Sequence, residues 1–117
     1  MTTKAIEVDV SRMHAAAGKA TMLLRALANS DRLLLLCHLS QGERCVSELE
    51  MELGIQQPTL SQQLTVLRTQ EIVRTRRDGK RIYYAVADPN ALAVLEMLYR
   101  LFCAPDSKRR ANRLGAV

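Results

Sequence analysis

The stretch of residues 55–70, IQQPTLSQQLTVLRTQ, constrains this chain most, because it predicts a helix with two contrasting faces. Leu60, Leu64 and Leu67 recur at the i, i+4, i+7 spacing of one buried stripe. Pro58 suits the first turn, where a helix does not use the backbone N–H and needs the φ that proline has. The opposite face has no charge before Arg68, and it carries only hydroxyls and amides: Thr59, Ser61, Gln62, Gln63 and Thr65.

Short hydroxyl and amide side chains are those that donate to and accept from base edges in a major groove. Residues 46–53, directly upstream, predict a short helix, and Gly54 and Ile55 predict the turn that follows it. Two helices joined in this way predict a helix-turn-helix. The alternative is an ordinary surface helix with a polar face.

After Ile72 the pattern changes from helical to alternating, which indicates two strands over residues 73–77 and 80–86. Asp78 and Gly79 between them predict a type I′ hairpin turn. The hairpin carries five basic residues against one acid, so we expect a basic wing and a DNA partner. The predicted DNA-binding residues are Gln57, Thr59, Ser61, Gln62, Gln63, Thr65, Arg68, Arg76, Arg77, Lys80 and Arg81.

Composition agrees with one small, mainly α-helical domain. The chain has 117 residues, of which 48% are hydrophobic and only 3% aromatic, and its formal charge is +5. Residues 74–81 carry +4 and residues 106–117 carry +3, so the remaining chain is −2, and such a distribution is typical of a protein that binds a polyanion. No apolar run exceeds six residues, so we expect no membrane span. Without a signal-peptide pattern, and with three cysteines, we expect a cytoplasmic protein without structural disulfides.

The remaining chain predicts three further helices. One runs from Ser11, as N-cap, to residue 28; the second is capped by Ser30 or Asp31, ends near residue 39 and is expected to be the most buried; the third covers about 91–103. The first and third have more apolar surface than their own core needs, which favours a homodimer that packs them across a two-fold axis. We therefore expect a flexible segment 1–10, a winged helix-turn-helix and dimerisation domain 11–104, and a basic disordered tail 105–117.

The motifs Gln57-Pro-Thr-Leu-Ser-Gln-Gln-Leu64 and Asp78-Gly-Lys-Arg-Ile-Tyr-Tyr84, within flanking helices, resemble the ArsR/SmtB family of bacterial repressors. The resemblance covers roughly residues 11–104. It implies a homodimer that holds operator DNA and releases it when an inducer binds.

The family is known for metal sites, which this chain matches only in part. Cys45 occupies the first thiolate position of one family site, but Ser47 replaces the second. The other family site uses Asp and His on the last helix, and the only histidines here are His14 and His38. No metal site is therefore predicted. A three-thiolate site from Cys37, Cys45 and Cys103 for a soft ion stays open as the alternative, which would make the chain a metal- or arsenite-responsive repressor.

The chain instead resembles the thiol-based branch of the family, typified by BigR, SqrR and HlyU. That branch pairs a cysteine of the second helix with one at the end of the last, and Cys37 and Cys103 match these positions. The resemblance implies oxidation of this pair by reactive sulfur species to a disulfide or polysulfide, followed by release from DNA. From the residues alone, Cys37 is better explained as a small core hydrophobe.

An enzyme is not expected. The sequence contains no Gly-rich phosphate loop, no carboxylate pair near a histidine and no nucleophile–base arrangement. No cofactor is predicted either. A family regulator without any effector is a further alternative.

Overall fold

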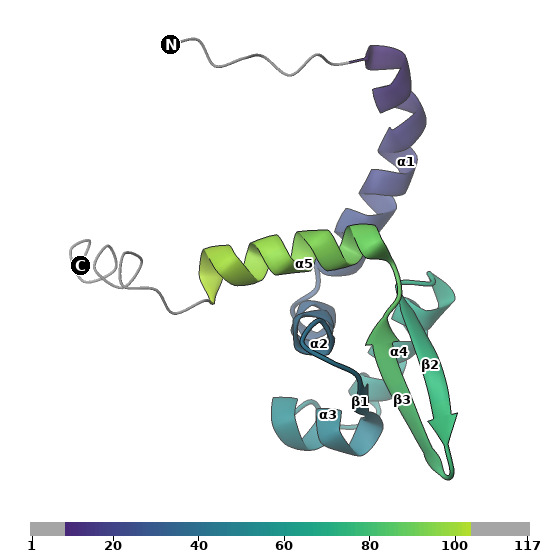
Figure 1. Cartoon of the computed structure of the whole chain (residues 1–117), viewed down its shortest axis with the longest axis vertical. Helices are drawn as coiled ribbons and strands as arrows, with labels where there is room; N and C mark the ends of the chain where they lie inside the picture. Colours follow the sequence, from purple (N-terminus) through teal and green to yellow (C-terminus); the bar gives the residue numbers. More distant parts are fainter. Residues whose placement is uncertain (1–8, 104–117) are drawn as a thin grey trace, which may run out of the picture.

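The computed structural model describes residues 9–103 as five helices and a small sheet (Figure 1). The predicted tail 105–117 and all but two residues of the predicted segment 1–10 lie outside this range. In chain order the elements are α1 (Val10–Leu27), α2 (Ser30–Leu39), β1 (Arg44–Cys45), α3 (Val46–Leu53), α4 (Thr59–Thr69), β2 (Val73–Asp78), β3 (Arg81–Val86) and α5 (Pro89–Phe102). The predicted winged helix-turn-helix is confirmed.

Side-chain caps set where the flanking helices begin. Asp9 accepts a hydrogen bond from the N–H of Arg12 (3.2 Å), so α1 begins at Val10 and the predicted N-cap Ser11 is wrong. Asn29 caps α2 by accepting from the N–H of Arg32 at 3.0 Å, in place of the predicted Ser30 or Asp31. Amide and carboxylate side chains satisfy N–H groups that a helix start leaves without partners, which is why Asp9 and Asn29 act as caps.

The sheet has the order β1-β3-β2 and is antiparallel throughout. Asp78 pairs with Arg81, so the turn is centred on Gly79 and Lys80 rather than on Asp78 and Gly79. Gly79, the first central residue of the turn, has φ +63°. Lys80, the second, does not have a positive φ, because Glu71 is the only non-glycine residue among 9–103 that does. A positive φ at the first central position alone is the pattern of a type II′ turn, so the predicted type I′ turn is wrong.

β1 was not predicted. It has only two residues, Arg44 and Cys45, which pair with Tyr84 and Tyr83 on the edge of β3. A strand this short has no alternating pattern that sequence analysis could detect. It attaches the wing to the start of α3, because Cys45 is also the N-cap residue of that helix.

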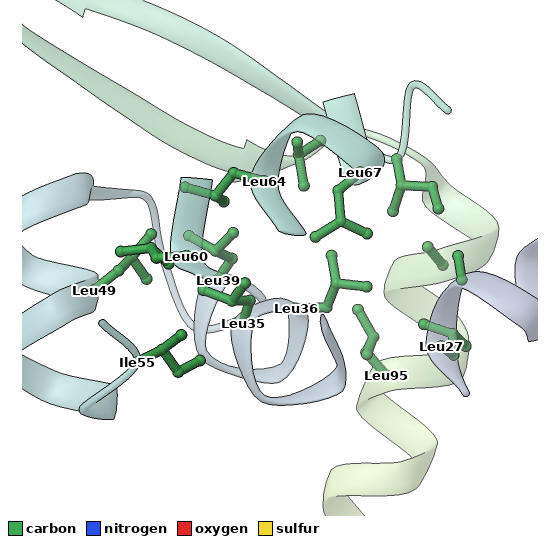
Figure 2. Packing of buried hydrophobic residues seen from close by; sticks show 14 residues of the cluster. Leu27, Leu35, Leu36, Leu39, Leu49, Ile55, Leu60, Leu64, Leu67 and Leu95 are labelled. Atoms are coloured by element: carbon green, nitrogen blue, oxygen red, sulfur yellow. The ribbon is translucent and has the colours of Figure 1, made fainter. Parts of the chain in front are cut away.

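Leucines from all five helices form one core, with those of α2 at its centre (Figure 2). Leu35 and Leu36 of α2 lie between Leu49 of α3 and Leu95 of α5, and all four side chains are fully buried. The predicted stripe of α4 is confirmed: Leu60, Leu64 and Leu67 are buried in the same cluster. α4 is the second helix of the helix-turn-helix, which is called the recognition helix. It therefore packs on the same core as α2 and α5.

α1 and α5 leave large apolar side chains uncovered. α1 extends from the body of the molecule, at the end opposite the hairpin tip (Figure 1), and buries only Ala26 and Leu27. Between residues 9 and 103 no helix is long and apolar enough to cross a membrane. The uncovered apolar residues of α1 and α5 are Val10, Met13, Met22, Leu24, Met97, Leu101 and Phe102.

Candidate nucleic-acid interface and cysteine pair

The turn between α3 and α4 is built from a left-handed glycine and a capping glutamine. Gly54, at φ +72°, closes α3 by donating its N–H to the carbonyl of Glu50 at 3.0 Å. Oε1 of Gln57 accepts a hydrogen bond from the N–H of Ser61 at 3.0 Å, which satisfies a donor in the first turn of α4. Gln57, predicted to bind DNA, therefore also has a structural task.

The predicted DNA-binding residues of α4 differ in exposure and in the hydrogen bonds that their side chains already make. Ser61, Gln62, Thr65 and Arg68 are exposed, whereas Thr59 and Gln63 are half-buried. The hydroxyl of Thr65 donates to the carbonyl of Ser61 at 2.8 Å. Within the described chain, the side chains of Ser61 and Gln62 make no hydrogen bond, so they are the hydroxyl and amide of this face most available to a ligand.

The hairpin exposes all of its basic residues, but two of them are engaged. Nη1 of Arg74 donates to the carbonyl of Val86 at 3.3 Å, and Arg76 is held by Glu43. Nη2 of Arg76 donates to Oε1 of Glu43 at 2.5 Å and Nε donates to Oε2 at 3.3 Å, while the guanidinium lies 4.7 Å from the ring centroid of Tyr83. The hydrogen bond from Arg76 lowers the pKa of Glu43. The other predicted wing contacts, Arg77, Lys80 and Arg81, make no ion pair within residues 9–103.

The two cysteines predicted to act together come from α2 and from the end of α5. Cys37 is half-buried and Cys103, the C-cap residue of α5, is exposed. Burial raises the pKa of Cys37, and the charge of Cys103 raises it further. The two thiols are therefore within electrostatic reach of each other, although 66 positions separate them in the sequence. Both are free thiols.

Cys45 lies in different surroundings. Its side chain is buried at 2% exposure, with Sγ 3.3 Å from the hydroxyl oxygen of Ser47. Its N–H donates to Oε1 of Glu48 at 2.9 Å, which completes the start of α3. Across the described part of the chain, no group of three or more His, Cys, Asp or Glu side chains is arranged to hold a metal ion.

Two polar contacts of α2 had no signal in the sequence. His38 Nε2 lies 2.5 Å from Oε1 of Glu52 on α3, and Nε of Arg44 donates to the same oxygen at 3.3 Å. At the other end of α2, Nη1 of Arg32 donates to Oε1 of Gln63 on α4 at 2.9 Å. These pairs are 14 and 31 positions apart in sequence, so no helical or strand period connects their members.

Known proteins resemble this chain in sequence and in fold. Residues 29–75 match the family model described as "Bacterial regulatory protein, arsR family". The "Biofilm growth-associated repressor" of Agrobacterium fabrum is 49% identical over 100 residues, which cover 86% of each chain. The "Transcriptional activator HlyU" of Vibrio cholerae is 36% identical over 86% of this chain and 93% of its own.

The fold comparison agrees. The crystal structure of the transcriptional repressor BigR from Xylella fastidiosa superposes with a TM-score of 0.77 at 44% identity, covering 84% of this chain and all of that one. Relatives this similar over most of their length are DNA-binding regulators rather than enzymes. The chain belongs to the arsR family of bacterial regulatory proteins, within the branch of winged-helix transcriptional regulators that contains BigR and HlyU.

Proposed function

We propose that the chain is a cytoplasmic, homodimeric repressor that releases operator DNA when reactive sulfur species oxidise Cys37 and Cys103. The observation that carries this proposal is the placement of the two free thiols: Cys37 is half-buried on α2 against the leucine core, and Cys103 is exposed at the end of α5, a helix that packs on the same core. Both helices contribute to the core that supports the recognition helix α4, since Leu36, Leu95 and Leu64 belong to one cluster.

DNA is bound by α4 and by the wing. Ser61 and Gln62 are exposed and make no side-chain hydrogen bond to residues 9–103, so they read base edges in the major groove. Arg77, Lys80 and Arg81 contact phosphates, which positions the protein but does not select a sequence. Four other predicted residues contribute less directly, because their side chains already make hydrogen bonds within the protein: Gln57, Gln63, Thr65 and Arg76. Thr59 and Arg68 complete the predicted set.

Two copies associate through α1 and α5. Leu24 is 60% exposed on α1, and Leu101 and Phe102 are 55% and 74% exposed on α5. Large apolar side chains left open on two helices are covered when a second copy packs on them. A two-fold axis also lets two recognition helices enter successive major grooves about 34 Å apart.

The thiol chemistry begins at the accessible sulfur. The thiolate of Cys103 attacks the sulfane sulfur of a persulfide RSSH, forms a Cys103 persulfide and releases RS⁻. The thiolate of Cys37 then attacks Sγ of Cys103, which forms the disulfide and expels hydrosulfide. Two thiols are oxidised, and the persulfide is reduced to one thiol and one hydrogen sulfide. A longer bridge needs a further sulfur from a second persulfide.

The bridge changes DNA affinity because Cys103 ends a helix that the proposed dimer buries. A displacement of α5 against α2 alters the spacing of the two recognition helices, and both half-sites have to fit at once. A coupling free energy of about 1–3 kcal/mol, or 5–150-fold in affinity, is sufficient for such a switch.

The test combines mass spectrometry with DNA binding. An operator duplex is first selected by the reduced protein from random DNA, and the protein is then treated with glutathione persulfide. We expect an intrachain link between Cys37 and Cys103 and loss of operator binding. Cys37→Ser and Cys103→Ser should bind the operator normally and no longer respond to the persulfide.

Cys45→Ser is the matched control, and it should respond as the wild type does. If Cys45→Ser were the unresponsive variant, a metal- or arsenite-responsive repressor would replace this proposal, and metal analysis of the reduced protein would test it. If all three variants responded, oxidation of these cysteines would not be the control mechanism.

A further inference from the structure

One arginine joins α1, α2 and α4. Arg32 lies in the first turn of α2 and is partly buried. Its Nε donates to the carbonyl of Ala26 at 2.8 Å and its Nη2 donates to the carbonyl of Arg25 at 3.2 Å, both in the last turn of α1. Its Nη1 donates to Oε1 of Gln63 on α4 at 2.9 Å. Each nitrogen of the guanidinium thus has its own partner.

This arrangement suits arginine better than any other residue. The last carbonyls of a helix have no partner within the helix, and the negative end of the helix dipole favours a cation there. The guanidinium is planar and rigid, so fixing two of its nitrogens on α1 also fixes the direction of the third. Lysine has a single nitrogen and cannot hold all three acceptors in this geometry.

The contact with Gln63 is the one side-chain hydrogen bond that links α4 to another helix within the described chain. It also restricts what Gln63 can bind. A glutamine recognises adenine through Oε1 and Nε2 together. Arg32 uses one lone pair of Oε1 and fixes the position of the amide, which leaves the second lone pair and the Nε2 donor. Because the side chain is half-buried and held in this way, Gln63 serves first as an anchoring point of the recognition helix.

We propose that Arg32 is a positioning residue that sets the orientation of α4 relative to α1 and α2 through Gln63. It also transmits displacement of α2 to the DNA-binding face; this second part rests on the proposed thiol switch, because Cys37 lies five positions further along the same helix. Hydrogen bonds weaken steeply as their angle falls. A small shift of α2 therefore changes or breaks the contact with Gln63.

The variants are Arg32→Met, Gln63→Met and the double variant, which remove the donor, the acceptor or both. Methionine matches glutamine in length and keeps most of the apolar stem of arginine. Arg25→Met is the matched control, because it removes an exposed guanidinium from the same region and leaves the Arg25 carbonyl in place. Dissociation constants are measured for the selected operator and for a random duplex over a range of salt, before and after glutathione persulfide. Thermal unfolding is followed in parallel.

We expect each single variant to lose about tenfold in operator affinity, the scale of one hydrogen bond to a charged donor. The double variant should lose no more than Gln63→Met alone, the salt slope should not change, and Arg25→Met should match the wild type. The fold-change on persulfide treatment should be smaller in both single variants. Gln62→Met, in contrast, should lose operator affinity and keep the full response.

Several results would overturn the inference. A lower melting temperature with an unchanged ratio of operator to random binding would make Arg32 merely structural. A salt slope reduced by about 0.9, with both duplexes affected alike, would make it a phosphate contact. Should Arg32→Met not fold, Gln63→Met decides these points alone.

The failure of this inference can be distinguished from failure of the thiol switch. If the cysteine variants stop responding to persulfide while Gln63→Met keeps the full response, the thiol switch stands and transmission through Arg32 is wrong. If the wild type itself does not respond, the thiol switch is wrong, and transmission falls with it. The operator affinities of the single and double variants still decide whether Arg32 orients α4.

Discussion

Arg76 of the wing is held by Glu43, which lies just before β1, with Nη2 of the arginine 2.5 Å from Oε1 of the carboxylate. The hydrogen bond from Arg76 lowers the pKa of Glu43 below that of an ordinary glutamate. The guanidinium also packs over the ring of Tyr83 on the neighbouring strand. One of the positive charges predicted to meet DNA is therefore already compensated within the protein.

Glu43→Gln should release Arg76 to a phosphate. We expect affinity for operator and random DNA to rise together, and the plot of log affinity against log salt to steepen by about 0.9. Arg81→Ala, at a residue without an ion pair in the described chain, should flatten the same plot by a similar amount and weaken both duplexes. An unchanged slope in Glu43→Gln would mean that Arg76 only fastens the wing to β1.

The outward face of α4 should carry sequence preference. Ser61→Ala or Gln62→Ala should cost about 1–3 kcal/mol on the selected operator and little on random DNA, because base contacts specify and phosphate contacts do not. Thr65→Val is a comparison on the same helix, since its hydroxyl is already bonded to the carbonyl of Ser61. Equal losses on both duplexes would contradict this division between α4 and the wing.

A charge on α5 should separate dimerisation from DNA reading. Leu101→Glu should sediment as a monomer, because the glutamate would be buried without a partner between two copies. Its operator binding should fall by more than one contact explains, since two half-sites are no longer linked. Met51→Glu, at a residue 82% exposed on α3, should remain dimeric. A dimeric Leu101→Glu with normal binding would place the interface elsewhere.

Alkylation by iodoacetamide should follow the order of exposure of the thiols. Cys103 should react before Cys37, and the rate at Cys37 should keep rising with pH beyond the range of an ordinary thiol, because burial and then Cys103 raise its pKa. Cys103→Ser removes the second cause, so the pH midpoint at Cys37 should move down but stay raised. An unmoved midpoint would show that the two thiols do not influence each other.

The contact between α2 and α3 should stabilise the protein only above acidic pH. The hydrogen bond with His38 is the largest cause of the lowered pKa of Glu52. A carboxyl whose folded pKa is depressed contributes stability above its unfolded pKa of about 4.3, and the contribution disappears as pH falls through the folded value. Melting temperatures of Glu52→Gln should therefore depend less on pH between about 5 and 3 than those of the wild type. Identical pH profiles would rule out this role.

Local features of the sequence were sufficient for most of the fold. The stripe of Leu60, Leu64 and Leu67 predicted α4 because burial of a helix face repeats every three or four residues. The hairpin was also predicted, although the turn moved by one residue and changed type. Its register depends on cross-strand pairs such as Asp78 with Arg81, and the identity of Gly79 alone does not specify it.

What the sequence determined by itself was the set of helices, the basic wing and the exposed polar face of α4, since these depend on neighbours within a few positions. Only the tertiary structure decided which side chains are already engaged. Arg32 with Gln63 and Arg76 with Glu43 are separated by 31 and 33 positions, and Cys37 lies further still from Cys103. No period in a sequence encodes such pairs, because they arise only when packing of the leucine core brings distant helices and strands together.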